Sequence, residues 1–280
     1  MRLLLLVVLL APLAAGCPSP RPGPAAPVAE VPPIEGSAEP GEELPRKRPK
    51  VTVRRAEIER TGDPEVTITF PVFETTELKL AARLSAISSE LRKMLESDAE
   101  AMEELARERD ANDLGMPFNL STSCAPTLVA DFLVSIECSS SNYTGGAHGN
   151  YGTTTHNYLL ESVDLRSLDV ATFFATAELP ALVDLVRSEL ARQGASEIVG
   201  GSVDDAELRA LLESFAVTTE GVVFHFDPYA VASYAEGGFE VRLSHAEVAR
   251  FLAAPFRASM QRIASGELGL DVVVDLPPSP

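Results

Sequence analysis

The chain has 280 residues, a hydrophobic content of 45 % and a formal net charge of −18 at pH 7. Nucleic acid is an unfavourable partner for so acidic a chain, because binding phosphate requires neutralisation by Lys and Arg. The length is sufficient for a sizeable hydrophobic core, in one large or two small domains.

Residues 1–16 have the layout of a secretory signal peptide, in which Arg2 precedes a short apolar run. This run is much shorter than the roughly 20 residues that a membrane-spanning helix needs. The following letters, LAAGC, end at Cys17 and resemble a bacterial lipobox. We therefore expect cleavage before Cys17 and its lipidation, which would anchor the protein to a membrane. The alternative is a simple secreted protein.

The expected anchor also suggests a localisation. Pro18 occupies the position where an Asp would resemble an inner-membrane retention signal. We therefore expect a cell-envelope lipoprotein in the outer membrane, facing the periplasm, with no other contact with the membrane.

Residues 17–60 are predicted to form a linker after the lipidated cysteine. Ten prolines fall between residues 18 and 50, without apolar periodicity, which is typical of a semi-rigid, extended tether. The basic run RKRPK at 46–50 could contact anionic envelope polymers, although a solvated segment explains it more simply.

From residue 61 the pattern indicates a folded domain. Alternating apolar residues predict a strand over 65–73, in which Pro71 suggests a sheet edge or a strand end. Apolar residues at helical spacing then predict a long amphipathic helix over 77–110. Alternation also predicts one half-buried strand over 128–138, and a further strand over 155–165 after a glycine-rich loop.

The C-terminal part is predicted to mix helices with hairpins. The expected elements are a helix ending at Gly194, a short helix over 204–214, a hairpin over 215–226, a strand over 239–243, a helix over 244–264 that Pro255 interrupts, and a strand over 270–276. Strands joined mostly as hairpins, with helices between them, predict an α+β fold with antiparallel sheets and packed helices.

Cys124 and Cys138 remain once Cys17 carries a lipid. In an oxidising compartment we expect them to form a disulfide, which closes a loop of about fifteen residues and stabilises the fold by about 3 kcal/mol. A zinc site is the alternative, but two histidine partners at the usual spacing are missing.

The stretch SNYTGGAHGNYGTTTHN, residues 141–157, gathers several candidate functional residues. Gly145 and Gly146 permit a sharp turn, but the spacing is not that of a phosphate-binding loop. His148 and His156 lie eight residues apart without a cysteine or histidine cluster, so neither a metal site nor a cofactor is expected. His148 is expected either to bond the backbone of its loop or to contact a ligand directly.

Two motifs resemble a bacterial envelope family. The letters YTGGAHGNYGTTTHNY at 143–158 are similar to the Y-x-G-G-A-H loop of a family that includes the extracellular domain of the anti-sigma factor RsiV and the N-terminal region of the peptidoglycan deacetylase PdaC. The segment at 221–248 is similar to that family's strand and P-Y-x-x-A signature, although His225 stands in a strand that is usually aromatic or apolar. The resemblance spans residues 62–253.

This resemblance implies two α+β sub-domains, a PdaC-like half over 61–160 and an RsiV C-terminal-like half over 161–280. It also implies a binding or sensor-like domain without catalysis, since the catalytic motifs of the deacetylase are absent. The implied partner is a lysozyme-like cationic protein or a cell-wall glycan such as peptidoglycan. The alternatives are an envelope enzyme that acts on peptidoglycan through His148 or Asp227, and a structural lipoprotein that scaffolds an envelope complex.

The candidate ligand-binding residues follow from the positions of the two motifs. They are Tyr143, His148 and Tyr151 in the first motif, and Asp227, Pro228 and Tyr229 in the second. Tyrosine suits recognition because its ring offers apolar area and one polar tip at a low entropic cost. Gly145 and Gly146 are expected to have a structural role.

Overall fold

The computed structural model describes residues 48–109, 115–160 and 165–275. The predicted signal peptide, the predicted lipidation site Cys17 and most of the predicted linker lie outside these residues. Within the described part, no helix combines the length and the apolar character that crossing a bilayer requires.

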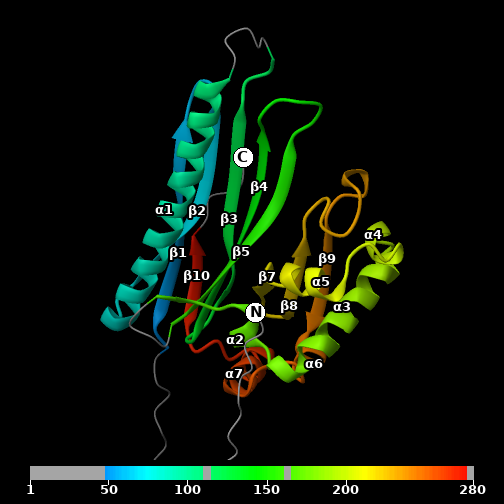
Figure 1. Ribbon diagram of the computed structural model, residues 1–280. Helices are drawn as coiled ribbons and strands as arrows, with labels where there is room; N and C mark the ends of the chain where they lie inside the picture. The colour runs from blue at the N-terminus through cyan, green and yellow to red at the C-terminus, as the bar shows by residue number, and fades with distance from the viewer. Residues whose placement is uncertain (1–47, 110–114, 161–164, 276–280) are drawn as a thin grey trace, which may run out of the picture. The chain divides into compact units, whose positions relative to one another are not determined.

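A seven-stranded sheet, here called the large sheet, has the strand order β10-β1-β2-β3-β4-β5-β6 (Figure 1). Its strands are β1 (Lys50–Arg60), β2 (Glu65–Thr75), β3 (Asn119–Val129), β4 (Leu133–Tyr143), β5 (Asn150–Leu159), β6 (Arg166–Ser167) and β10 (Asp271–Asp275). The pairs β1–β10 and β2–β3 are parallel and the others antiparallel. The α+β class is therefore confirmed, with a mixed large sheet in place of a purely antiparallel one.

Strand β1 contradicts the prediction of a linker over residues 17–60. Val51 and Val53 are fully buried, and β1 pairs with β2 along nearly all of its length. The alternation of valine with polar residues after Pro49 carries this signal, since the proline-rich segment ends there and period-2 patterning begins. The tether therefore ends before residue 50.

Strand β2 lies inside the large sheet, so Pro71 does not mark an edge strand. Residues Glu65–Thr69 pair with β3 on one side, and Val66–Thr75 pair with β1 on the other side. Pro71 falls after the last residue paired with β3. The missing N–H of Pro71 therefore removes no hydrogen bond from the β2–β3 ladder, and the proline lies just beyond the end of that ladder.

Helix α1 (Leu78–Glu108) confirms the predicted long helix and packs along the large sheet, chiefly against β2 (Figure 1). Its buried face repeats at helical spacing and includes Leu84, Ile87, Leu91 and Leu95. These side chains join apolar residues of the sheet in one hydrophobic cluster, here called the first core.

The strand predicted over 128–138 is instead a hairpin that turns at Ala130–Phe132. The Ala130 N–H donates to the carbonyl of Leu133 (2.9 Å), and Arg262 makes two hydrogen bonds to the carboxylate of Asp131 (2.9 and 3.0 Å). Alternation does not reveal this turn, because both faces of the two strands are buried close to it. Leu128 and Leu133 pack in a different core from Val134.

The disulfide between Cys124 and Cys138 is confirmed. The two cysteines are directly opposite each other in the β3–β4 ladder, with their Cα atoms 3.9 Å apart. Both are buried in the first core beneath α1.

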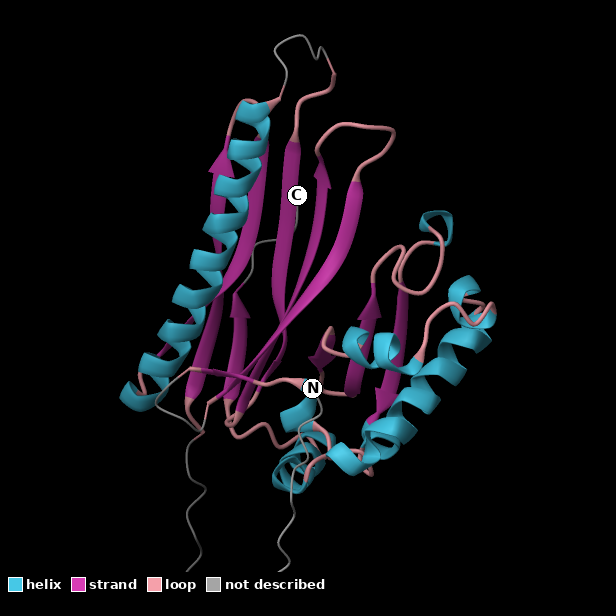
Figure 2. Cartoon of the chain, in the orientation of Figure 1, coloured by secondary structure: helices cyan, strands magenta, loops and turns pink. Residues whose placement is uncertain are grey.

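A second core surrounds a three-stranded sheet with the order β7-β8-β9 (Figure 2). Its strands are β7 (Phe215–Val217), β8 (Gly221–Phe226) and β9 (Phe239–Ser244). The helices of this part are α2 (Val170–Phe173), η1 (Thr176–Glu178), α3 (Leu179–Gln193), α4 (Ser196–Val199), α5 (Asp205–Leu211), η2 (Tyr234–Glu236), α6 (His245–Val248) and α7 (Ala254–Ala264). Pro255 lies in the first turn of α7, so the helix predicted over 244–264 is two helices.

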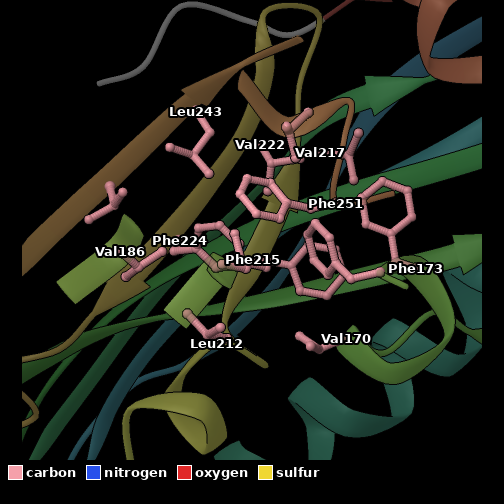
Figure 3. Packing of buried hydrophobic residues seen from close by; sticks show 14 of the residues in the cluster. Val170, Phe173, Val186, Leu212, Phe215, Val217, Val222, Phe224, Leu243 and Phe251 are labelled. Atoms are coloured by element: carbon pink, nitrogen blue, oxygen red, sulfur yellow. The ribbon is translucent and has the colours of Figure 1, made fainter. Parts of the chain in front are cut away.

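Aromatic rings fill the centre of the second core. The rings of Phe173, Phe215, Phe224 and Phe251 converge between the small sheet and its helices (Figure 3). The ring of Phe215 stacks on that of Phe173, with centroids 5.6 Å apart, and lies 6.3 Å from that of Phe224.

The predicted division at residue 160 does not separate the two cores. Strand β10, which belongs to the C-terminal half, returns to the large sheet and pairs with β1. Leu128 and Leu133 of the N-terminal half pack in the second core, and Nδ2 of Asn157 donates to the carbonyl of Phe215 (2.7 Å). Residues 47–280 accordingly form one compact unit.

Candidate binding site at the junction of two loops

The stretch at 141–157 is a hairpin with a short connection, because β5 begins at Asn150, five residues earlier than predicted. Gly145 and Gly146 have φ angles of 95° and 93°, which glycine adopts without the steric cost of a side chain. The hydroxyl of Tyr143 donates to the carbonyl of Gly146 (3.1 Å) and braces the turn from within. The structural role expected of both glycines agrees with this geometry.

Tyr234 joins this turn to the loop that follows β8. Its hydroxyl donates to the carbonyl of Gly149 (2.6 Å), and its ring stacks on that of His148, with centroids 4.0 Å apart and planes at 22°. The ring of Tyr151 meets the Tyr234 ring edge-on, with centroids 5.9 Å apart. The centroid of the Tyr229 ring lies 5.4 Å from that of Tyr234. These four rings, from residues 148, 151, 229 and 234, are called the aromatic cluster below.

The position of Tyr234 is fixed by the hydrogen bonds of its short helix η2. Ser233 and Glu236 form a capping box, and the hydroxyl of Ser196 donates to the same carboxylate (2.7 Å). The hydrogen bond from Ser233 lowers the pKa of Glu236, and that from Ser196 lowers it further. The ring that links the two loops is therefore held at both its backbone and its hydroxyl.

Asp227 forms a second link between the two segments. Its Oδ1 accepts a hydrogen bond from the backbone N–H of Thr153 in β5 (2.8 Å). Gly152 makes room for this contact, because a Cβ at that position would lie 2.6 Å from Oδ2 of Asp227. The carboxylate thus sits directly over the backbone of β5.

Gly152→Ala is expected to push the Asp227 carboxylate away and to break its bond with Thr153. The cost should be about 1–2 kcal/mol in the free energy of unfolding, because one charge-assisted hydrogen bond is lost while an exposed side chain can still move. Urea denaturation of this variant would measure the cost, and loss of the contact is its expected source because Gly152 is not among the positive-φ glycines of the described residues. An unchanged amide exchange rate at Thr153 would contradict this account.

Next to this link lies a cleft of about 460 Å³, called the site cleft below. It is lined by residues of β5 from Tyr151 to Thr153, by the segment from His225 to Pro228, and by the segment from Gly237 to Glu240. The ring of Tyr229 lines a neighbouring hollow of about 680 Å³ together with Glu197 and Glu207. The turn that carries Pro228 and Tyr229 therefore contributes to both.

His225 is buried at the site cleft between two carboxylates. Its Nε2 lies 3.2 Å from Oε2 of Glu137, and its Nδ1 lies 3.5 Å from Oε1 of Glu240. The contact with His225 lowers the pKa of Glu137, and the charges of His225 and Arg242 act in the same direction against the effect of burial. The Glu137 carboxylate is therefore stabilised in its charged form.

An open face of the large sheet extends from the same site. Residues directly opposite each other in the ladders share a face, and here they bear hydroxyl groups at Thr67, Thr69, Ser121, Ser123, Ser139, Ser141 and Thr153. The four serines are exposed, and Tyr151 pairs with Ser141 at one end of the array. We call this surface the hydroxyl face.

The structure brings five of the six candidate residues to one place. His148, Tyr151 and Tyr229 belong to the aromatic cluster, and Asp227 and Pro228 line the site cleft. Tyr143 bonds within its own turn and lies outside the cluster. Among the described residues, no group of three or more His, Cys, Asp or Glu side chains is placed to hold a metal ion.

Sequence reasoning missed Tyr234 and the buried set around His225. A signal for Tyr234 existed, because all five tyrosines of the chain fall in the two motifs. No sequence signal could pair His225 with Glu137, since they come from different sheets and meet only through the tertiary fold.

Comparisons with known proteins match two separate segments of the chain to family models. Residues 171–246 match the model described as a protein of unknown function, DUF3298, and residues 61–151 match the one described as deacetylase PdaC. No curated protein matches the chain.

Solved structures resemble the chain at low sequence identity. A DUF3298 family member from Bacteroides fragilis has 18 % identity and a TM-score of 0.54, covering 76 % of this chain and 98 % of that one. A DUF3298 family protein from Pseudomonas aeruginosa has 18 % identity and a TM-score of 0.47, covering 74 % and 95 %. The first similarity supports the fold.

Proposed function

We propose that the protein is a lipid-anchored binding or sensor-like domain of the cell envelope, without catalysis. The observation that carries this proposal is the aromatic cluster, which two loops distant in sequence assemble at one surface. Two of its tyrosines are exposed, Tyr151 at 47 % and Tyr229 at 64 %. Tyrosines clustered in this way are typical of recognition surfaces.

Backbone strain at Tyr229 supports the same proposal. It has a φ of 71° and is the one non-glycine residue with positive φ within the described part of the chain. Such a conformation costs about 1–3 kcal/mol and is retained mainly at functional sites. A large exposed ring held in this conformation contributes little to stability. We therefore assign to the Tyr229 ring the role of contacting a ligand.

The ligand that best fits the charge is a cationic protein of the lysozyme type. A net charge of −18 favours association with a positively charged partner and increases its association rate at low salt. The aromatic cluster would supply the buried centre of the interface, and surrounding carboxylates its polar rim.

Titration of lysozyme against residues 47–280 tests this function. We expect saturable binding that Tyr229→Gly weakens at least tenfold, because the ring is lost, while stability is unchanged or higher because glycine accepts the positive φ. Leu78→Ala, which truncates an exposed side chain on α1, is the matched control and should bind like the wild type. Absence of binding by the wild type at low salt would remove the lysozyme version of the proposal.

A cell-wall glycan is the second candidate ligand, and the hydroxyl face favours it. Rows of hydroxyl groups can exchange hydrogen bonds with a polymer rich in hydroxyl and amide groups, and the row ends at Tyr151. Cosedimentation with insoluble peptidoglycan, and its loss in a Ser121→Glu/Ser139→Glu variant, would support this ligand. Release of any soluble fragment from the peptidoglycan during the same incubation would contradict a non-catalytic role.

A further inference from the structure

We propose that the site cleft receives one positively charged group of the ligand, a guanidinium or an ammonium group. This inference rests on the proposed binding function and specifies the chemistry that one part of the site recognises. It is carried by the carboxylates around the site cleft, by a buried histidine with unused bonding capacity, and by an aromatic wall.

The carboxylates supply the counter-charge. Oδ1 of Asp227 accepts from Thr153, while Oδ2 makes no hydrogen bond within the residues that the structure describes. Glu240 also lines the site cleft and pairs with Arg242, whose side chain is largely exposed and does not line the site cleft. A donor entering here would find a carboxylate oxygen available on Asp227 and a second carboxylate nearby.

His225 is the second, independent sign of a ligand. Only 4 % of its side chain is exposed, it contributes to the lining, and its Nε2 makes no hydrogen bond of normal geometry although Glu137 is close. A buried polar atom without a hydrogen bond costs about 1–3 kcal/mol. The Nδ1 of the same ring lies 3.5 Å from Glu240, so an N–H group that enters the site cleft beside His225 would reach the Glu240 carboxylate, which otherwise contacts His225 and Arg242.

The site cleft is large enough to receive a cationic group of a ligand. Its volume of about 460 Å³ lies in the range of small-ligand sites, and the ring of Tyr151 forms part of its wall. An aromatic face attracts a guanidinium or ammonium group by a cation–π interaction. An anionic group would instead meet Asp227 and Glu240, and like-charge contact is strongly unfavourable.

The test uses L-argininamide as a probe of the site cleft in ¹⁵N-labelled residues 47–280. The Thr153 amide reports directly, because it donates to Asp227. We expect saturable shifts at Thr153 and at residues 225–228, and at least a fivefold weaker affinity for Asp227→Asn, which retains the hydrogen-bond acceptor but loses the charge. Glu240→Gln should weaken binding as well. Glu100→Gln, which removes the same charge from an exposed position on α1, should not.

Saturable shifts lost in Asp227→Asn and kept in Glu100→Gln would establish the inference, whether or not lysozyme binds. Absence of saturable shifts at the site cleft, or equal affinity in Asp227→Asn and the wild type, would overturn it. Lysozyme binding by an otherwise unchanged Asp227→Asn variant would leave the proposed function in place while removing the cation subsite. The two proposals therefore fail separately.

Discussion

Phe215→Ala is expected to lower the free energy of unfolding by about 3–5 kcal/mol, the largest effect that we predict for one residue. The ring is 1 % exposed and contacts the rings of Phe173, Phe174 and Phe224, so truncation leaves a cavity that rigid neighbours cannot fill. This is a large share of the roughly 5–15 kcal/mol that stabilises a typical domain.

Urea denaturation followed by two probes would measure this effect. Far-ultraviolet circular dichroism reports on both sheets, while exchange of the Asn157 side-chain amide reports on its bond to the carbonyl of Phe215. Because the two cores share strands, both probes should shift together. Phe215→Leu is the control and should cost much less. A loss below 1 kcal/mol for Phe215→Ala would show that the second core is not packed as described.

Removal of the disulfide is expected to cost about 3 kcal/mol. Cys124 and Cys138 are 14 residues apart, and in the chain-entropy model a bond closing a loop of this size restricts the unfolded chain by about that amount. The Cys124→Ala/Cys138→Ala variant should show a lower urea midpoint with a native-like folded spectrum, because the β3–β4 ladder and the packing under α1 remain.

Reductant provides the control for this prediction. Dithiothreitol should lower the midpoint of the wild-type protein but leave that of the double variant unchanged. Equal midpoints for oxidised wild type and double variant would mean that the bond contributes nothing, and would contradict the expected restriction of the unfolded chain.

Local patterns predicted much of the fold because their causes are local. Helix α1 follows from the spacing of Leu84, Ile87 and Leu91, and the start of α6 follows from the capping box of Ser244 and Glu247. The break between α6 and α7 follows from Pro255, which cannot continue a helix but begins one well.

The errors arise where two cores bury opposite faces of the same strands. The β3–β4 turn was hidden because residues on both sides of it are apolar, so the usual contrast between a buried and an exposed face is lost. The pairing of β10 with β1 likewise cannot be predicted from the local sequence, because β1 lies more than two hundred residues before β10.

The candidate site shows the same division between local and tertiary information. The two motifs marked both loops, and Gly145 and Gly146 have the backbone geometry that their residue type suggests. The joining contacts did not follow from either motif alone. Tyr234 reaches across to the carbonyl of Gly149, and Asp227 reaches the amide of Thr153.

The central claim is that the two loops form one binding surface, and amide hydrogen exchange would test it most directly. The exchange of residues 47–280 would be measured alone and then saturated with lysozyme or with soluble peptidoglycan fragments, whichever binds. If the two loops form one recognition surface, protection should rise together at residues 143–153 and 227–238. Little change is expected along α1 or in α7. Protection confined to α1, or to one of the two loops without the other, would contradict the assignment of the aromatic cluster as the binding surface.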